Sequence, residues 1–77
     1  MAKIKGWNKL DDADTWFNPK SKRVLKLRKY VSGPLRYWYF IVSNKEQSKI
    51  FSTYGNYDKK EQAYKEAMRY MRRHPKG

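Results

Sequence analysis

The stretch that decides the fold is Leu35 to Ser43, which reads LRYWYFIVS. It is the most β-prone run in the chain, because aromatic and β-branched side chains fit the pleated surface of a sheet. Both alternating rows are apolar or aromatic, which predicts a central strand. The more apolar row, expected to face the core, is Trp38, Phe40 and Val42. The opposite row is Tyr37, Tyr39 and Ile41.

Two further strands are expected beside this one. Residues 23–31 alternate regularly and place Lys26, Arg28 and Tyr30 on one face. Residues 32–34, Ser-Gly-Pro, form a strong turn signal before the central strand. After the central strand, a turn at 44–47 leads to a strand at 49–54, which Gly55-Asn56 is expected to end.

An N-terminal extension, residues 1–22, precedes these strands. Residues 3–10 could form one short strand, and the acidic residues at 11, 12 and 14 would cluster in a turn. Residues 15–17 make a second apolar run, followed by Asn-Pro-Lys-Ser at 18–21, which suits a type I turn. A hairpin joining the runs before and after this turn is therefore predicted.

A helix is predicted over residues 58–74. Asp58 is the expected N-cap, with Glu61 completing a pattern like a capping box, and Pro75 stops the helix. The apolar stripe at helical spacing is Ala63, Tyr64, Ala67, Met68 and Met71. The sequence thus predicts one α+β domain over residues 1–77, in which three to five antiparallel strands carry one C-terminal helix on one face.

The charge of the chain points to a polyanion. Nineteen Lys and Arg stand against seven Asp and Glu, a net charge of +12 in 77 residues. Such a surplus repels itself unless a polyanion neutralises it, and the usual cytosolic polyanions are DNA and RNA. Aromatic residues make up 17% of the chain, which is typical of a folded module and not of a disordered basic tail.

Several function classes are disfavoured. With no cysteine and a single histidine, His74, the chain is expected to hold no disulfide, no metal and no cofactor. No phosphate loop, nucleophile elbow or metal-spaced cluster is present, so we expect no enzyme. No apolar run approaches membrane-spanning length and no signal peptide is evident. We therefore expect a cytoplasmic protein that does not bind membranes, nucleoid-associated if it binds DNA.

The predicted nucleic-acid interface is a basic and aromatic sheet face. Its candidate residues are Lys26, Arg28, Tyr30, Arg36, Tyr37, Tyr39 and Lys49. Arginine and lysine on a ribbon can enter the major groove of a duplex, whereas tyrosine rings can stack on unpaired bases. A secondary basic surface is expected on the helix, for phosphate contacts or simply as a solvated face: Lys65, Arg69, Arg72 and Arg73.

The residues from 24 to 74 resemble a known layout. A strand with alternating Lys26 and Arg28, a Trp-led strand from Trp38 to Val42, and a short third strand precede a helix reading EQAYKEA. This layout is similar to the plant ethylene-response-factor DNA-binding domain and to the N-terminal arm-binding domain of tyrosine recombinases. The resemblance implies that the exposed sheet face enters the major groove. The groove-facing residues it implies are Lys26, Arg28, Tyr39 and Lys49.

Three interpretations stay open at this stage. The leading one is a small DNA-binding protein that favours duplex DNA, and the second is a single-stranded DNA or RNA binder that stacks bases on Tyr37 and Tyr39. The third is a protein-interaction regulator of phage, viral or plasmid type, with an apolar patch around Trp7, Trp16 and Phe17. Plain packing is the competing interpretation for all these rings. An open edge strand could also pair two copies into a homodimer.

Overall fold

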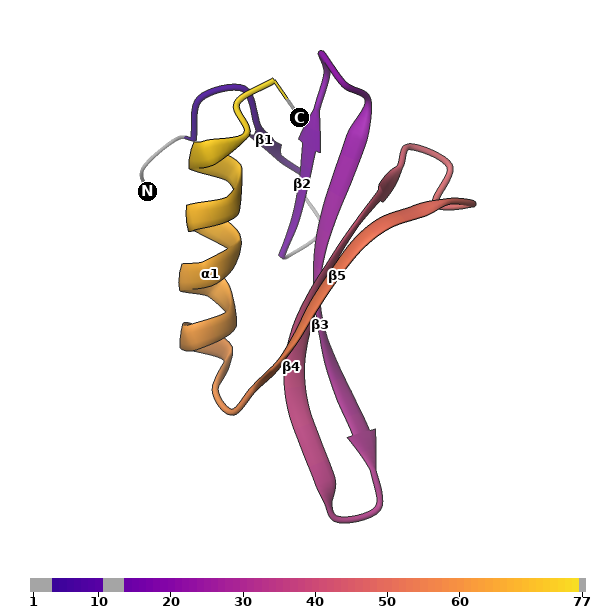
Figure 1. The fold of residues 1–77 in the computed structure, drawn as a ribbon, viewed down its shortest axis with the longest axis vertical. Coiled ribbons are helices and arrows are strands. Elements are labelled where there is room, and N and C mark those ends of the chain that lie inside the picture. Colours follow the sequence, from indigo (N-terminus) through magenta and orange to yellow (C-terminus); the bar gives the residue numbers. More distant parts are fainter. Residues whose placement is uncertain (1–3, 11–13, 77) are drawn as a thin grey trace.

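The computed structural model describes residues 4–10 and 14–76, and it has five antiparallel strands and one helix. The strands follow one another in the sheet in chain order, and the helix packs on one face (Figure 1). The elements are β1 (Asn8–Lys9), β2 (Thr15–Asn18), β3 (Arg23–Ser32), β4 (Leu35–Asn44), β5 (Ile50–Tyr57) and α1 (Lys60–Arg73). The predicted fold class, a small antiparallel sheet with a C-terminal helix, is confirmed.

The long hairpin of β3 and β4 is the centre of the sheet. All ten residues of β3 pair with β4, from Arg23 opposite Asn44 to Ser32 opposite Leu35. The two-residue turn between the strands has Gly33 at a φ of 58°, and a glycine in this first central position is the signature of a type II′ turn. Such turns match the right-handed twist of the strands, so the turn fixes the register of the whole hairpin.

The core lies between the sheet and α1. Leu25 and Leu27 are buried opposite Val42 and Phe40, which are also fully buried. Trp38 packs against the edge of this cluster, so the predicted inward row of the central strand is confirmed. The helix contributes the fully buried Ala63, Ala67 and Met71, with Tyr64 and Met68 half-buried beside them, as the stripe predicts.

The N-terminal extension joins the sheet and closes the end of the core. β1 and β2 pair alongside β3, but β1 is shorter than the strand expected over residues 3–10. Trp7 is 1% exposed, and its indole Nε1 donates a hydrogen bond to the carbonyl of His74 at 2.8 Å. Asn18 Nδ2 donates to the carbonyl of Pro75 at 3.1 Å. Trp7 and the end of β2 are therefore bound to the residues that follow α1.

The turns of the extension follow the prediction in part. Asn18 Oδ1 accepts hydrogen bonds from the backbone N–H groups of Lys20 and Ser21, at 2.9 and 3.1 Å, which confirms a turn at 18–21. Asp14 forms an ion pair with Lys60 at 3.1 Å. The other members of the expected acidic turn, residues 11 and 12, lie outside the described residues.

The predicted boundary between the last strand and the helix was wrong. β5 does not end at Gly55-Asn56 but continues to Tyr57, and its one extra residue is accommodated as an irregularity in the pairing with β4 between Trp38 and Phe40. The chain then needs residues 58 and 59 to leave the sheet. Asp58 is consequently not the N-cap; Lys59 takes that position in an extended conformation, without a side-chain cap, and the helix begins at Lys60.

The tip of the β3–β4 hairpin projects beyond the helix. We call the segment from Arg28 to Tyr39 the arm; its end lies past the start of α1 (Figure 1). Residues 28–36 are all exposed, including Val31 and Leu35 at 55% each. Over residues 28–36, the arm is thus a two-stranded ribbon exposed on both faces.

Within residues 4–10 and 14–76, α1 lacks the length and apolar character needed to cross a membrane.

A substitution at Gly6 tests the contact between the N-terminal segment and the residues that follow α1. It has a φ of 85°, and a Cβ placed there would overlap the carbonyl of Pro75. Gly33 has a similar φ of 58°, but nothing lies within 4 Å of an added Cβ. We expect Gly33→Ala to lower the free energy of unfolding by about 1–2 kcal/mol through backbone strain alone. Gly6→Ala should cost a further ~1–3 kcal/mol through overpacking, measured by urea denaturation.

The two variants change the unfolded chain in the same way, so their difference isolates the contact with Pro75. Equal losses of stability in Gly6→Ala and Gly33→Ala would contradict the close packing of the N- and C-terminal segments.

Candidate nucleic-acid interface

The sheet face turned away from α1 collects most of the predicted interface. Directly paired residues of antiparallel strands share a face, so the register defines its members. Thr15, Lys26, Ile41 and Thr53 form one cross-strand row, Arg28 pairs with Tyr39, and Tyr30 pairs with Tyr37. We call this surface the open face, because in the described part of the chain the helix packs only on the opposite side.

The basic residues of the open face line a groove that has both apolar and polar walls. The groove has a volume of about 330 Å³ and is lined by Leu10, Thr15, Phe17, Val24, Lys26, Arg28, Lys45 and Gln47. Lys26 Nζ donates a hydrogen bond to Gln47 Oε1, and the Arg28 guanidinium donates to the Leu27 carbonyl at 3.2 Å. Both side chains are held by neutral acceptors, so their positive charges are not cancelled there.

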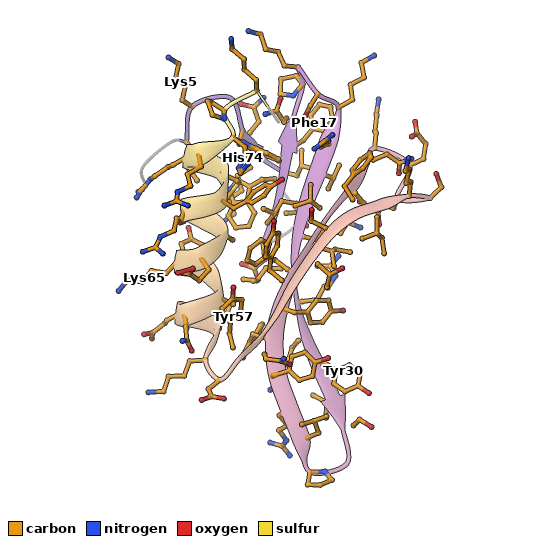
Figure 2. All side chains as sticks on the ribbon, in the orientation of Figure 1. Lys5, Phe17, Tyr30, Tyr57, Lys65 and His74 are labelled. Atoms are coloured by element: carbon orange, nitrogen blue, oxygen red, sulfur yellow. The ribbon has the colours of Figure 1, made fainter. Side chains whose placement is uncertain are left out.

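A row of three tyrosines continues the open face along the arm. The rings of Tyr30 and Tyr37 stack with centroids 4.9 Å apart, and Tyr39 lies 6.0 Å from Tyr37. Gly55 of β5 lies next to this row: an added Cβ would come within 3.2 Å of the Tyr39 Cβ. Because glycine places no side chain there, the tyrosine row is left uncovered on the β5 side. Tyr30 lies on the projecting hairpin (Figure 2), and its side chain is 40% exposed.

Among the described residues, no carboxylate forms an ion pair with a side chain of the open face. Two ion pairs occur among the residues that the structure describes, Lys60 with Asp14 and Arg69 with Glu66, and neither uses a residue of the open face. From Thr15 to Lys45 the sequence has eight Lys and Arg and no Asp or Glu. That acid-free stretch, which covers β2, β3 and β4, is a sequence signal that the strand-by-strand reading missed.

Two predicted residues lie elsewhere. Arg36 pairs with Val31, which places it on the reverse side of the arm with Trp38. Lys49 precedes β5, and its Nζ lies 5.5 Å from the centroid of the Phe51 ring. The guanidinium of Arg23 lies 4.3 Å from the same centroid, and Arg23 shares the core-facing row of β3 with Leu25. Pairing between β4 and β5 is shifted between Val42 and Ser43, so simple alternation could not place Lys49. The open face therefore joins five of the seven predicted residues, and Arg36 and Lys49 are separate from them.

The reverse side of the arm carries its own positive charge. Lys29 Nζ lies 5.6 Å from the centroid of the Trp38 ring, and Lys60 of the helix lies at the same distance from that ring. Arg36 is the neighbouring exposed residue in this row. Sequence reasoning assigned no role to Lys29, although its alternation with Arg28 already placed basic residues on both faces of one strand.

The secondary basic surface is a separate region. Lys65, Arg69, Arg72 and Arg73 are exposed on the side of α1 away from the core, where Lys65 points away from the sheet (Figure 2). With Glu66 they line a hollow of about 470 Å³. The sheet and the body of the helix lie between this surface and the open face. The structure therefore divides the positive charge over two opposite sides.

The apolar patch expected around the first two tryptophans is not on the surface. Trp7 and Trp16 are 1% and 3% exposed and belong to the core, while Phe17 is half-buried in the groove. A domain of this size needs large rings to close its core, which explains their burial. The exposed large apolar residues lie instead at scattered positions: Leu10 after β1, Val31 and Leu35 on the arm, and others on β5 such as Ile50.

Neither metal ligands nor known relatives add evidence about the function of this surface. Within the described ranges, no three His, Asp or Glu side chains are grouped as metal ligands. Comparisons with protein-family models, curated proteins and solved structures find no match to this chain. The resemblance to sheet-based DNA-binding domains therefore stays a prediction.

Two tyrosines between the sheet and α1 provide a test of this packing by pH. Burial, aided by the Glu66 carboxylate and Tyr54, raises the pKa of Tyr57. Burial also raises the pKa of Tyr70, with a contribution from Tyr54, and Arg23 opposes that rise. The folded protein thus keeps phenolic protons that the unfolded chain releases above about pH 10.

The stabilisation linked to these raised pKa values is fully present below about pH 10 and is lost as the pH rises through the folded values. We expect the free energy of unfolding to fall with pH in this range, and to fall less steeply in Tyr57→Phe/Tyr70→Phe. Urea denaturation from about pH 8 to about pH 11 measures both slopes. Identical slopes in the two proteins would contradict the burial of these phenols.

Proposed function

We propose that this protein binds nucleic acid, with duplex DNA as the favoured form, through the open face and the arm. One observation carries the proposal: Lys26 and Arg28 share the open face with three tyrosines, and no described carboxylate pairs with either. Positive side chains without acidic partners can neutralise phosphates and release counterions, which supplies most of the affinity of a non-enzymatic DNA binder. The net charge of +12 supports the same proposal.

The shape of the arm favours a duplex. A two-stranded ribbon fits the major groove, which is about 12 Å wide. On such a ribbon the open-face row would meet base edges, where Arg28 could form the bidentate contact to guanine that its planar guanidinium permits. The reverse row would approach the walls of the groove, and there Lys29 and Arg36 could contact phosphates. Both faces of the arm have a role in this arrangement.

The tyrosine row supports a second mode, in which unpaired bases stack on the rings. Each base stacked on an aromatic side chain contributes about 1–3 kcal/mol. Tyr30 and Tyr37 already stack on each other, so only the outer faces of the pair are available to a base. This mode uses the same surface as the duplex mode, and competition between the two nucleic-acid forms separates them.

Removing the two open-face cations should weaken duplex binding. We expect Lys26→Ala/Arg28→Ala to reduce the slope of log affinity against log salt by at most about 1.8, which is about 0.9 for each side chain that contacts a phosphate, and by less where Arg28 contacts a base edge instead. The affinity itself should fall by about tenfold or more at low salt. Fluorescence anisotropy with a labelled duplex at several salt concentrations measures both.

The matched control is Lys5→Ala/Lys59→Ala, which removes the same charge at exposed positions outside the open face and the arm. It should change affinity much less. If both pairs of substitutions have the same effect, net charge alone drives binding and the open face is not the interface. If the folded protein binds no oligonucleotide in dilute buffer, the proposed nucleic-acid binding is wrong and a protein-interaction role takes its place.

Tyr37 distinguishes the two modes of binding. In the duplex mode, unlabelled duplex competes better than single-stranded DNA or RNA of equal length, and Tyr37→Phe and Tyr37→Ala both retain most of the duplex affinity. In the stacking mode, Tyr37→Phe is nearly silent whereas Tyr37→Ala loses about 1–3 kcal/mol of single-strand affinity. A preference for single strands together with that loss would overturn the duplex assignment.

A further inference from the structure

The outer surface of α1 is a second cationic row, built by helical periodicity. Lys65, Arg69 and Arg72 lie on the side of the helix opposite the buried Ala63, Ala67 and Met71, because residues at i, i+4 and i+7 share one face. Arg73 flanks them. At 1.5 Å per residue, the row from Lys65 to Arg73 is about 12 Å long. Each strand of a duplex carries roughly three to four phosphates along that length, so the four cations match a run of phosphates on one strand.

This row and the open face point in opposite directions. An α-helix with side chains is about 10–12 Å thick, and packed layers lie about 10 Å apart, so about 20 Å of protein separates the two cationic surfaces. A single straight duplex cannot touch both. Wrapping one around a body of this size would require strong bending, which costs about 1–6 kcal/mol or more over 20–30 base pairs. Two separate segments can occupy the two sides without bending.

From this arrangement we infer that the protein bridges two nucleic-acid segments, one on the open face and a second on the outer row of α1; the inference rests on the proposed function. The second occupant is identified by charge and by the chemistry of the row. Three of its four cations are arginines, whose guanidinium groups bind phosphates bidentately. Glu66 offsets this charge only partly, through an exposed ion pair with Arg69 at 3.7 Å, and such pairs are weak.

The outer row does not suit insertion into a membrane. Its exposed positions on α1 are charged or polar, and the apolar side chains of the helix face the core. Interfacial helices instead need an unpartnered apolar face that buries into the lipid boundary. A phosphate run of a nucleic acid needs only the cations.

A capture experiment tests the bridge. A biotinylated duplex on beads is incubated with the protein and with a second, fluorescent duplex that lacks biotin. We expect the wild-type protein to retain the fluorescent duplex, with a maximum at intermediate protein concentration, because excess protein coats each duplex separately. Free duplex binding is measured in parallel by anisotropy under the same conditions.

The separating variant is Lys65→Ala/Arg72→Ala. Alanine has the highest helix propensity, so α1 should remain intact. Circular dichroism of the variant is the measurement that checks this. This variant should bind a single duplex within about threefold of the wild type through the open face, yet lose most of the capture. Lys5→Ala/Lys59→Ala, with the same loss of charge, should capture normally.

Each outcome has one meaning. Duplex binding without capture by the wild-type protein overturns the bridge and leaves the proposed function standing. Undiminished capture by Lys65→Ala/Arg72→Ala also overturns it, and shows that two copies of the protein, associated through another surface, hold the two duplexes. Absence of any duplex binding instead overturns the proposed function itself.

Discussion

Leu25 and Leu27 of β3 lie opposite Val42 and Phe40 of β4, and these four side chains are fully buried beneath α1. Because side chains alternate along a strand, this one registration decides the direction of every other residue in the hairpin. A slip of one residue would turn the leucines to solvent and bring Lys26 and Arg28 into the core. The burial of the apolar row therefore also holds the basic row outside.

The helix stabilises this registration of β3 and β4 because it packs closely on the sheet. Ala63 and Ala67 present only methyl groups to the sheet and are fully buried, while Met71 fills the space nearer the end of the core. Tyr57 and Tyr70 close the margin of the core beside Phe40, with ring centroids 6.3 and 6.2 Å from it. Trp7 then binds the last residues of the helix to the N-terminal segment. Because both ends of the core are closed, the helix can pack on the sheet in one position, in which its cations face away from the sheet.

Much of this could be predicted from the sequence, because it depends on short-range periodicity. The inward row of Phe40 and Val42 and the helix stripe of Ala63 and Ala67 follow from periods of 2 and 3.6 residues. The misplaced features depend on pairing between strands. Lys49 lies next to a shift in the β4–β5 register. Asp58 is not the N-cap because β5 continues to Tyr57, with one extra residue accommodated as a bulge. No local pattern in one strand reveals how its neighbour is paired.

The candidate site was predictable to the same extent, because it too depends partly on alternation within a strand and partly on pairing between strands. Lys26, Arg28 and Tyr30 alternate within one strand, so their common face was predictable, and their meeting with Tyr37 and Tyr39 required only the hairpin. Arg36 was ambiguous because it stands one residue from the tyrosine row, and the register with Val31 decides its side.

A net charge of +12 on 77 residues opposes folding by self-repulsion, and one marginal core must overcome it. The structure reduces the repulsion by distance, since the cations are distributed over the open face, both sides of the arm and the outer side of α1. Pairing reduces the repulsion little, because within the described ranges only Lys60 and Arg69 have carboxylate partners. A chain selected for stability alone could place acids among these cations at little cost. Their absence from residues 15–45 leaves a repulsive energy that binding to a polyanion would remove, so a bound nucleic acid would stabilise the fold as it occupies the surface.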